Sequence, residues 1–188
     1  MTNPTDTSHQ DGVFFETLLP LSWSLVSHPV PSFILDEWMQ TNITILRALS
    51  TMEALPIDKE NELGATAAKA IDRLEAKIDL SLTLLAKLLV QNTAFPQAVA
   101  VTLSGSSVKW INPEGPTLGN DVTLSLYLSH RIPQPLILPA KVTSSEIETD
   151  GLHTSATFTD LSAEMQDWLE RTIFRYHRRS IQQRHSGK

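Results

Sequence analysis

Three hydrophobic periods follow one another along the chain, and each predicts a different element. Residues 12–26 alternate apolar and polar side chains, which is typical of a strand, although Pro20 is tolerated only at an edge or a bulge. After a Pro-Val-Pro break, Ser32 can cap a helix whose apolar positions recur at threes and fours to about Glu53. Pro56 ends this helix, because a residue before proline avoids the helical region.

The next helical segment is unusually long and has a heptad pattern. It begins after Asp58 and continues to about Gln91, roughly 33 residues, with its main body from Asn61 to Val90. With Ile71 as the first heptad position, one stripe carries the residues Ala67, Ile71, Leu74, Ile78, Ser81, Leu85 and Leu88. Charged residues flank this stripe, which is the pattern of a coiled-coil seam. We therefore predict that the helix assembles with copies of itself and that the chain works as an oligomer.

Two arrangements could cover the stripe. One is the self-association described above. The other is an intramolecular hairpin, in which the long helix would pack against the helix of residues 32–53. That helix is about ten residues shorter and would leave several leucines in water, where apolar surface favours association by roughly 25 cal/mol per Å². Leu82, Leu84 and Leu89 widen the apolar face, which favours more than two helices or additional packing on the shorter helix.

From residue 97 onward the hydrophobic period changes to two. Five strands are predicted, at Ala98–Ser104, Ser107–Ile111, Asp121–Ser129, Leu136–Ser144 and His153–Phe158. A final helix spans about Ser162 to Gln183, with Asp160 or Ser162 near its cap. Trp110 is predicted to lie in the core. One face of the final helix is predicted to pack on the sheet through the residues Leu161, Met165, Trp168, Leu169 and Phe174.

These elements define an α+β chain in four parts. We expect residues 1–12 to be a flexible tail, residues 13–27 the first barrel strand, residues 32–93 a helical insertion that contains the oligomerisation helices, and residues 97–188 the remaining barrel with a C-terminal helix. Several short strands at regular spacing favour an antiparallel barrel, and the first strand brings their number to six. The helices are then inserted between the first and second strands.

Composition narrows the classes of protein. The chain has no cysteine, which excludes disulfides and thiolate metal sites and fits a reducing cytoplasm, and it has no apolar run long enough to span a membrane. Its net charge is −6, yet residues 161–188 hold six of the 15 Lys and Arg residues and only three of the 21 acidic ones. The basic end can attract phosphates or an acidic partner, or can simply suit a helix C-terminus, whereas the acidic body argues against nucleic-acid binding.

The C-terminal half resembles the PilZ domain, a small bacterial β-barrel family associated with sensing cyclic di-GMP. The matching pieces, in order, are Val99–Val108, Gly119–Leu124, Leu136–Val142, Ala156–Ser162 and Thr172–Arg179. An interrupted barrel with long helices after its first strand resembles an atypical branch of the family whose members form tetramers through heptad-bearing helices. The resemblance implies a six-stranded antiparallel barrel, four copies, and a role in motility, pilus function or virulence.

The ligand residues of that family are largely missing. In its (Asp/Asn)-x-Ser-x-x-Gly motif, Thr102 stands in place of the Asp or Asn, Ser104 is retained, and Ser107 replaces the glycine. The family's Arg-x-x-x-Arg arm before the barrel is absent, since no arginine occurs before Arg47. Residues 171, 175 and 179 match the spacing, but they lie on the C-terminal helix, and we interpret that match as coincidental. We therefore expect the usual dinucleotide grip to be lost and predict no cofactor.

No pattern in the sequence predicts catalysis. The six histidines are scattered without metal-ligand spacing, and neither a nucleophile elbow nor a phosphate loop is present, so we predict no catalytic and no metal site. Two hypotheses remain. The first is a non-enzymatic signalling adaptor that acts on another bacterial signalling or motility protein. The second is an atypical cyclic di-GMP receptor that binds through Arg171, Arg175 and Arg179 of the same or a neighbouring subunit.

Overall fold

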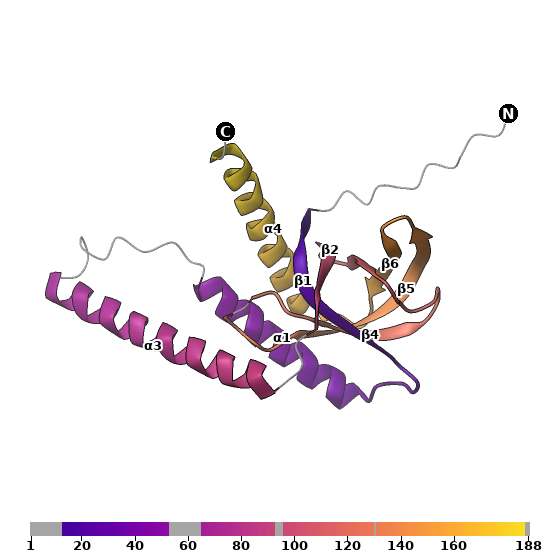
Figure 1. Ribbon diagram of the computed structural model, residues 1–188. Coiled ribbons are helices and arrows are strands. Elements are labelled where there is room, and N and C mark those ends of the chain that lie inside the picture. The colour runs from indigo at the N-terminus through magenta and orange to yellow at the C-terminus, as the bar shows by residue number, and fades with distance from the viewer. Residues whose placement is uncertain (1–12, 53–64, 93–95, 130, 187–188) are drawn as a thin grey trace.

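A closed six-stranded barrel is the body of the molecule. The computed structural model describes residues 13–52, 65–92, 96–129 and 131–186. All neighbouring strands are antiparallel and follow the order β1-β2-β3-β6-β5-β4 around the barrel (Figure 1). The strands are β1 Phe14–Leu25, β2 Ala98–Ser104, β3 Ser107–Asn112, β4 Asp121–Leu126, β5 Leu136–Glu148 and β6 Gly151–Phe158. The predicted barrel, with helices inserted after the first strand and a helix at the C-terminus, is confirmed. The expected tail of residues 1–12 lies outside the described residues.

The first strand closes the barrel by pairing with two partners in turn. Phe14 to Pro20 pair with β2, and Leu21 to Leu25 pair with β4. Pro20 lies where the partner changes, and its carbonyl accepts a hydrogen bond from the Tyr127 amide at 3.1 Å. A closed barrel has no edge strand, so the missing N–H of the proline is tolerated at this change of partner instead.

Alternate residues of each strand fill the barrel. The buried apolar side chains of the strands are Leu19, Leu21, Val101, Leu103, Val108, Trp110, Val122, Leu124, Leu126, Leu136, Leu138, Ala140, Val142, Ala156 and Phe158. Trp110 is buried, as predicted. This interior accounts for the period of two in the second half of the sequence, because residues two apart share one face of a strand.

Two strands, β4 and β5, end three or more residues away from the predicted position. β4 ends at Leu126 because its partner β5 begins at Leu136, the residue that pairs with Leu126. β5 runs on to Glu148 as the first strand of a hairpin with β6, and an irregularity between Val142 and Ser144 shifts its register. That irregularity breaks the alternation from which the strand's end was predicted.

The first helix covers one side of the barrel. α1, Ser32–Met52, begins one residue earlier than a Ser32 cap predicts: Ser32 is its first helical residue, and the Pro31 carbonyl closes the first turn by accepting hydrogen bonds from the Ile34 and Leu35 amides. Its buried residues, Met39, Asn42, Ile43, Ile45, Leu46 and Leu49, face β5 and the C-terminal helix. The apolar stripe of α1 is therefore used inside the chain.

The C-terminal helix, α4, packs on the same body. It spans Ala163–Ser186, and the Ser162 hydroxyl caps it by accepting the Met165 amide at 3.1 Å. Met165, Leu169, Thr172 and Ile173 are buried against α1 and β1, and Leu161 and Trp168 are partly buried. The predicted contact of Phe174 with the barrel is wrong. Phe174 follows Ile173 by about 100° around the helix, which turns its ring to solvent, and the ring is 54% exposed.

The long helix stands apart from this body. α3 spans Ala65–Asn92, while the predicted start of the helix, between residues 58 and 64, lies outside the described residues. Within the part of the chain that the structure describes, no other element packs against α3 (Figure 1). The hairpin alternative is therefore not observed, because α1 packs its apolar face on the barrel and α4.

Candidate functional site

The predicted seam of α3 is open to solvent. Four of its large apolar residues, Leu74, Ile78, Leu85 and Leu88, are each 57–59% exposed, whereas Ile71 is half-buried. Burying what remains exposed would contribute roughly 1 kcal/mol for each side chain. Ser81 is the polar member of the seam, and its hydroxyl donates to the Lys77 carbonyl at 2.9 Å, so the residue can be buried without an unsatisfied donor.

The degenerate ligand motif forms the turn between β2 and β3. Thr102 is half-buried between its strand partners Glu16 and Lys109. The Ser104 hydroxyl accepts the Ser107 amide at 3.0 Å and lies 2.8 Å from the Ser107 hydroxyl. The retained serine therefore holds the turn together, and its hydroxyl already has partners within the protein.

A carboxylate lies over the same turn. A Cβ atom placed on Gly105 would collide with Cγ of Glu170 in α4 and would lie 3.0 Å from Glu170 Oε1. Gln166 donates a hydrogen bond to Glu170 Oε1 at 3.0 Å and so helps to orient the carboxylate. A negative charge at this position opposes a dinucleotide phosphate by direct repulsion. The sequence alone did not single out Glu170, because the contact joins residues that are far apart in the chain.

A hollow of about 520 Å³ spans parts of β1, β2, β3 and β6, and Thr102 is one of its lining residues. Its lining residues are Glu16, Thr17, Leu18, Ala100, Val101, Thr102, Lys109, Trp110, Ile111, His153, Thr154 and Ser155. It contains one lysine, one acid and no arginine. A phosphate-binding site of the usual kind uses arginine, whose planar fork contacts phosphate oxygens in pairs. The hollow lacks that chemistry.

The three arginines of the alternative hypothesis have different surroundings. Arg171 pairs with Asp167 at 2.9 Å, and its guanidinium lies 5.7 Å from the centre of the Trp168 ring. Arg175 donates to the Ser50 hydroxyl at 2.6 Å and so joins α4 to α1. Arg179 is half-buried on the next turn. Arg175 is thus engaged in holding two helices together.

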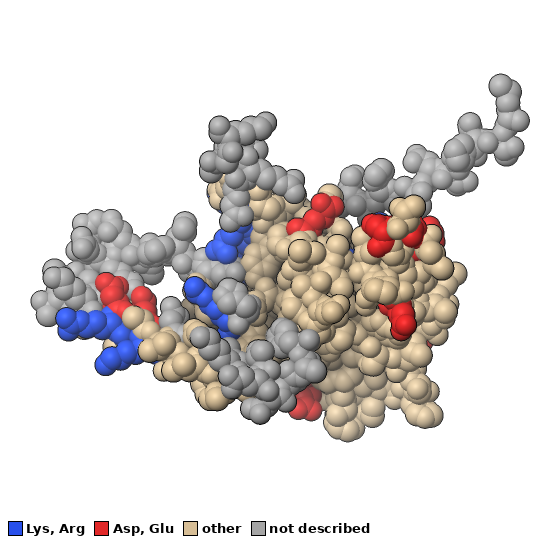
Figure 2. Space-filling model, viewed as in Figure 1, with Lys and Arg blue, Asp and Glu red and all other residues tan. Residues whose placement is uncertain are grey.

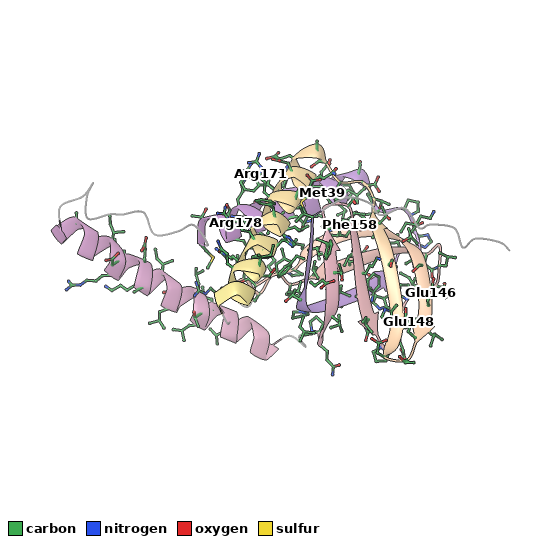
Figure 3. All side chains as sticks on the ribbon, turned by 90° about the horizontal axis from the view of Figure 1, so that it is seen from above. Met39, Glu146, Glu148, Phe158, Arg171 and Arg178 are labelled. Carbon is green, nitrogen blue, oxygen red and sulfur yellow. The ribbon has the colours of Figure 1, made fainter. Side chains whose placement is uncertain are left out.

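The turn between β5 and β6 brings together three groups that sequence spacing did not predict to meet. His153 Nε2 lies 2.7 Å from Asp150 Oδ1, and His153 Nδ1 lies 3.8 Å from Glu148 Oε1. The hydrogen bond with Asp150 raises the pKa of His153 and lowers the pKa of Asp150. The three groups are close enough to hold a metal ion, but exposed acidic groups commonly lie close together without one. Figure 3 shows Glu146 and Glu148 at the end of the barrel away from Arg171 and Arg178 of α4.

The chain is thus a closed antiparallel barrel with a long inserted helix and a C-terminal helix. Comparison with known proteins identifies its family. The family model of the atypical PilZ domain, described as a cyclic di-GMP receptor, matches residues 46–185. The chain belongs to this family. No curated protein matches the sequence.

One solved structure matches nearly the whole chain. It is a pathogenic protein from Xanthomonas campestris, described as a tetrameric PilZ domain that self-assembles via an unusual helical bundle. The two chains are 28% identical, the match covers 92% of each, and the TM-score is 0.75. An inhibitor of motility from Bacillus subtilis matches at 13% identity over 42% of this chain and 40% of that one. Its TM-score of 0.36 is too low to support an argument.

Among the helices of the described residues, none has both the length and the apolar character needed to cross a bilayer.

Proposed function

We propose that this chain is a cytoplasmic, non-enzymatic signalling protein that works as a homotetramer assembled through α3. The exposed seam of α3 is the observation that carries this proposal. A helix with this much solvent-exposed apolar surface gains stability on association. The tetrameric description of the Xanthomonas campestris protein supports four copies. In this proposal α3 serves assembly, and the barrel with α1 and α4 serves recognition of a protein partner.

Sedimentation equilibrium of the full chain tests the assembly. The wild-type protein is expected to sediment as a tetramer, and the Leu74→Asp/Ile78→Asp variant as a monomer, because each change would bury a carboxylate in the seam. Ala76→Asp/Leu80→Asp is the matched control, since it has the same spacing on the opposite side of α3 and should remain assembled. A wild-type monomer at tens of micromolar would refute the proposal.

We further propose that the usual cyclic di-GMP grip is lost in this protein. Three observations support this view: the Ser104 hydroxyl closes its own turn, Glu170 places a carboxylate over that turn, and the adjacent hollow has no arginine. Together they remove the donors and add the charge that would oppose a phosphate. The function then depends on protein contacts of the assembled barrels.

The family's description as a cyclic di-GMP receptor favours a second candidate function, an atypical receptor. Titration calorimetry with cyclic di-GMP separates the two. We expect no saturable heat from the wild-type chain. That result would mean a dissociation constant above about 1 mM, which corresponds to a binding free energy weaker than about 4 kcal/mol. Micromolar binding would refute the adaptor-only function.

If binding is observed, three variants locate it. Loss of binding in Lys109→Ala would assign the ligand to the hollow, and loss in Arg171→Ala would assign it to α4. Arg178→Ala is the matched control, because Arg178 is exposed on the same helix. Arg175→Ala is a poorer probe, since removing its bond to Ser50 also loosens the contact between α1 and α4.

A further inference from the structure

The end of β5 that extends past β4 has an open edge. β4 pairs with β5 only as far as Lys141, and the turn before β4 adds backbone hydrogen bonds to Val142. From there to Glu148, β5 has β6 as its strand partner on one side. Within the described residues no strand covers the other side, so residues 144–148 form an unpaired sheet edge outside the closed part of the barrel. Figure 1 shows this hairpin on the side of the barrel away from α3.

The free backbone groups of this edge belong to Ser145 and Ile147. In an antiparallel ladder, successive residues turn their N–H and C=O groups alternately to one neighbouring strand and to the other. The amide and carbonyl of Val142 bond the β4 side, and the register shift between Val142 and Ser144 adds one residue to the alternation. After the shift, Ser145 and Ile147 direct their N–H and C=O groups away from β6. Among the described residues, no other element bonds these groups.

The side chains of the edge combine acidic groups with one exposed apolar residue. Glu146 and Glu148 share one face of β5, Asp150 follows in the turn, and all three are exposed. The basic group beside them is His153, the strand partner of Glu146. Ile147 lies on the opposite face and is 88% exposed, the highest value among the large apolar residues of the described chain. Figure 3 shows Glu146 and Glu148 together at this end of the barrel.

Charge separates this edge from the rest of the molecule. Figure 2 shows acidic side chains over the β5–β6 end of the barrel, whereas the larger groups of basic side chains on that face lie over α3 and beside α4. Two copies that paired along this edge would bring Glu146 and Glu148 against carboxylates of the same kind, which opposes association. The edge therefore favours a basic partner over a second copy of this chain.

Protection is the alternative role for charges on an edge, because they prevent unwanted pairing of strands. It accounts for Glu146 and Glu148. It gives no role to Ile147, a β-branched residue that lies between them and whose backbone groups face the open side. A strand of opposite charge would use the carboxylates, the backbone groups and the apolar side chain together.

We propose that residues 144–148 accept an extended segment of a partner protein as an added strand, and that this segment alternates Lys or Arg with apolar residues. Its backbone would bond Ser145 and Ile147, as in other strand additions. Its basic side chains would lie beside Glu146 and Glu148, and its apolar side chains beside Ile147, because residues two apart share one face of a strand. This inference rests on the proposed adaptor function and specifies where the barrel binds its partner.

Fluorescence anisotropy with the full chain tests the chemistry of the partner. The probe is the labelled, capped peptide Lys-Val-Lys-Val-Lys-Val-Lys, which should bind saturably at low salt. Glu146→Lys/Glu148→Lys should weaken this binding about tenfold or more, because two attractive cross-strand pairs become repulsive. Asp36→Lys/Glu37→Lys makes the same change of net charge at exposed positions of α1 and is the matched control, which should bind as wild type does. The peptide Glu-Val-Glu-Val-Glu-Val-Glu should show the reverse preference.

Backbone pairing is tested separately from attraction between charges. Ile147→Pro removes an N–H that faces away from β6, a position where an edge strand tolerates proline, so the hairpin should stay folded while binding weakens about tenfold. Ile147→Ala keeps the N–H and should lose less. In the wild-type chain, amide hydrogen exchange at Ser145 and Ile147, measured by NMR, should slow when the peptide is added. Exchange at Glu146, whose N–H faces β6, should change little.

The other outcomes identify what failed. A peptide that does not bind, or that loses as much affinity in Asp36→Lys/Glu37→Lys as in Glu146→Lys/Glu148→Lys, would overturn the inference. Binding without slower exchange at Ser145 and Ile147 would mean attraction between charges alone and would also overturn it, even where Ile147→Pro disturbs the hairpin. Sedimentation of the same samples is an independent readout. A tetramer that binds no peptide leaves the proposed assembly intact, whereas a monomer that binds it refutes the assembly and leaves the strand addition in place.

Discussion

Asn42 joins α1 to the barrel although it is a polar residue with no exposed surface. Its amide donates to the Ile137 carbonyl at 2.7 Å, and its oxygen accepts the Ile137 amide at 2.9 Å. β6 pairs with β5 only from Ala140 onward, so the backbone of Ile137 has no strand partner on that side. Asn42 takes the place of that partner and satisfies both buried groups.

Asn42→Leu is expected to lower the free energy of unfolding by about 2–4 kcal/mol. The change keeps the size of the side chain but leaves a buried N–H and a buried carbonyl without partners, each at a cost of about 1–3 kcal/mol. Urea unfolding followed by tryptophan fluorescence measures it. Thr44→Ala is the control, an exposed position on the same helix where the loss should stay within about 0.5 kcal/mol. Equal losses at both sites would mean that the Ile137 contact contributes little.

His153 should titrate above its ordinary pKa of 6.5, because its largest perturbation is the hydrogen bond to Asp150. Its contribution to stability is present below pH 6.5 and is lost as the pH rises through the raised pKa. The lowered pKa of Asp150 has the opposite sign: its contribution is present above pH 3.8 and is lost as the pH falls through the lowered value. The pair of His153 and Asp150 therefore contributes most to stability between pH 3.8 and pH 6.5.

NMR titration of the imidazole tests this assignment. Asp150→Asn should return the pKa of His153 toward 6.5, and Glu148→Gln should lower it less, because the Glu148 carboxylate acts only through its charge. An unchanged pKa in Asp150→Asn would show that the hydrogen bond does not form in solution.

The residues that the sequence failed to identify share one property, which is that long-range packing places them. The turn motif at Thr102, Ser104 and Ser107 was readable from local pattern, but the carboxylate of Glu170 reaches that turn only because α4 folds back on β2. Phe174 was assigned to the buried face because it is aromatic and near Leu169. Helix geometry instead aligns Ile173 with that face.

At the scale of helices and strands, the hydrophobic period and the length of each segment predicted most of the structure. α1, the barrel strands and α4 appear where their apolar periods place them, and Ser162 proved to be the cap of α4. The exact course of β5 was not predictable, because its register depends on an irregularity opposite β6. The choice between hairpin and free helix was also open, since the sequence does not show which surface the face of α1 covers.

Ser162→Ala tests the cap of α4. The change removes the acceptor of the Met165 amide and should lower the free energy of unfolding, measured with heat or urea, by about 1 kcal/mol. Ser162→Asp should keep most of the stability, because its carboxylate can accept the same amide and also suits the positive end of the helix dipole. Equal destabilisation by both variants would mean that Ser162 acts through packing rather than as a cap.

At the scale of the molecule, α3 and the barrel body are two separable parts. No described element packs on α3, whereas α1 and α4 pack on the barrel and on each other. In the Leu74→Asp/Ile78→Asp variant, the unfolding transition that the four tryptophans of the barrel body report in near-ultraviolet circular dichroism should therefore stay close to that of wild type. The far-ultraviolet helical signal should fall, because most of the stability of a helix in a protein comes from the packing of its apolar face. Loss of this near-ultraviolet transition would show that assembly supports the barrel.

The divided pairing of β1 has a consequence for how the chain is made. Both partners of β1 lie beyond the helical insertion, so this strand waits for residues 98–126 before it can join the barrel. Compared with a short hairpin turn, the loop of residues 26–97 adds only about 2–3 kcal/mol of closure entropy, but it imposes an order in time. During synthesis from the N-terminus, α3 is complete while the barrel is still open. If α3 assembles as proposed, nascent chains on one messenger can pair their helices before any barrel has closed, which would favour partners made from the same message.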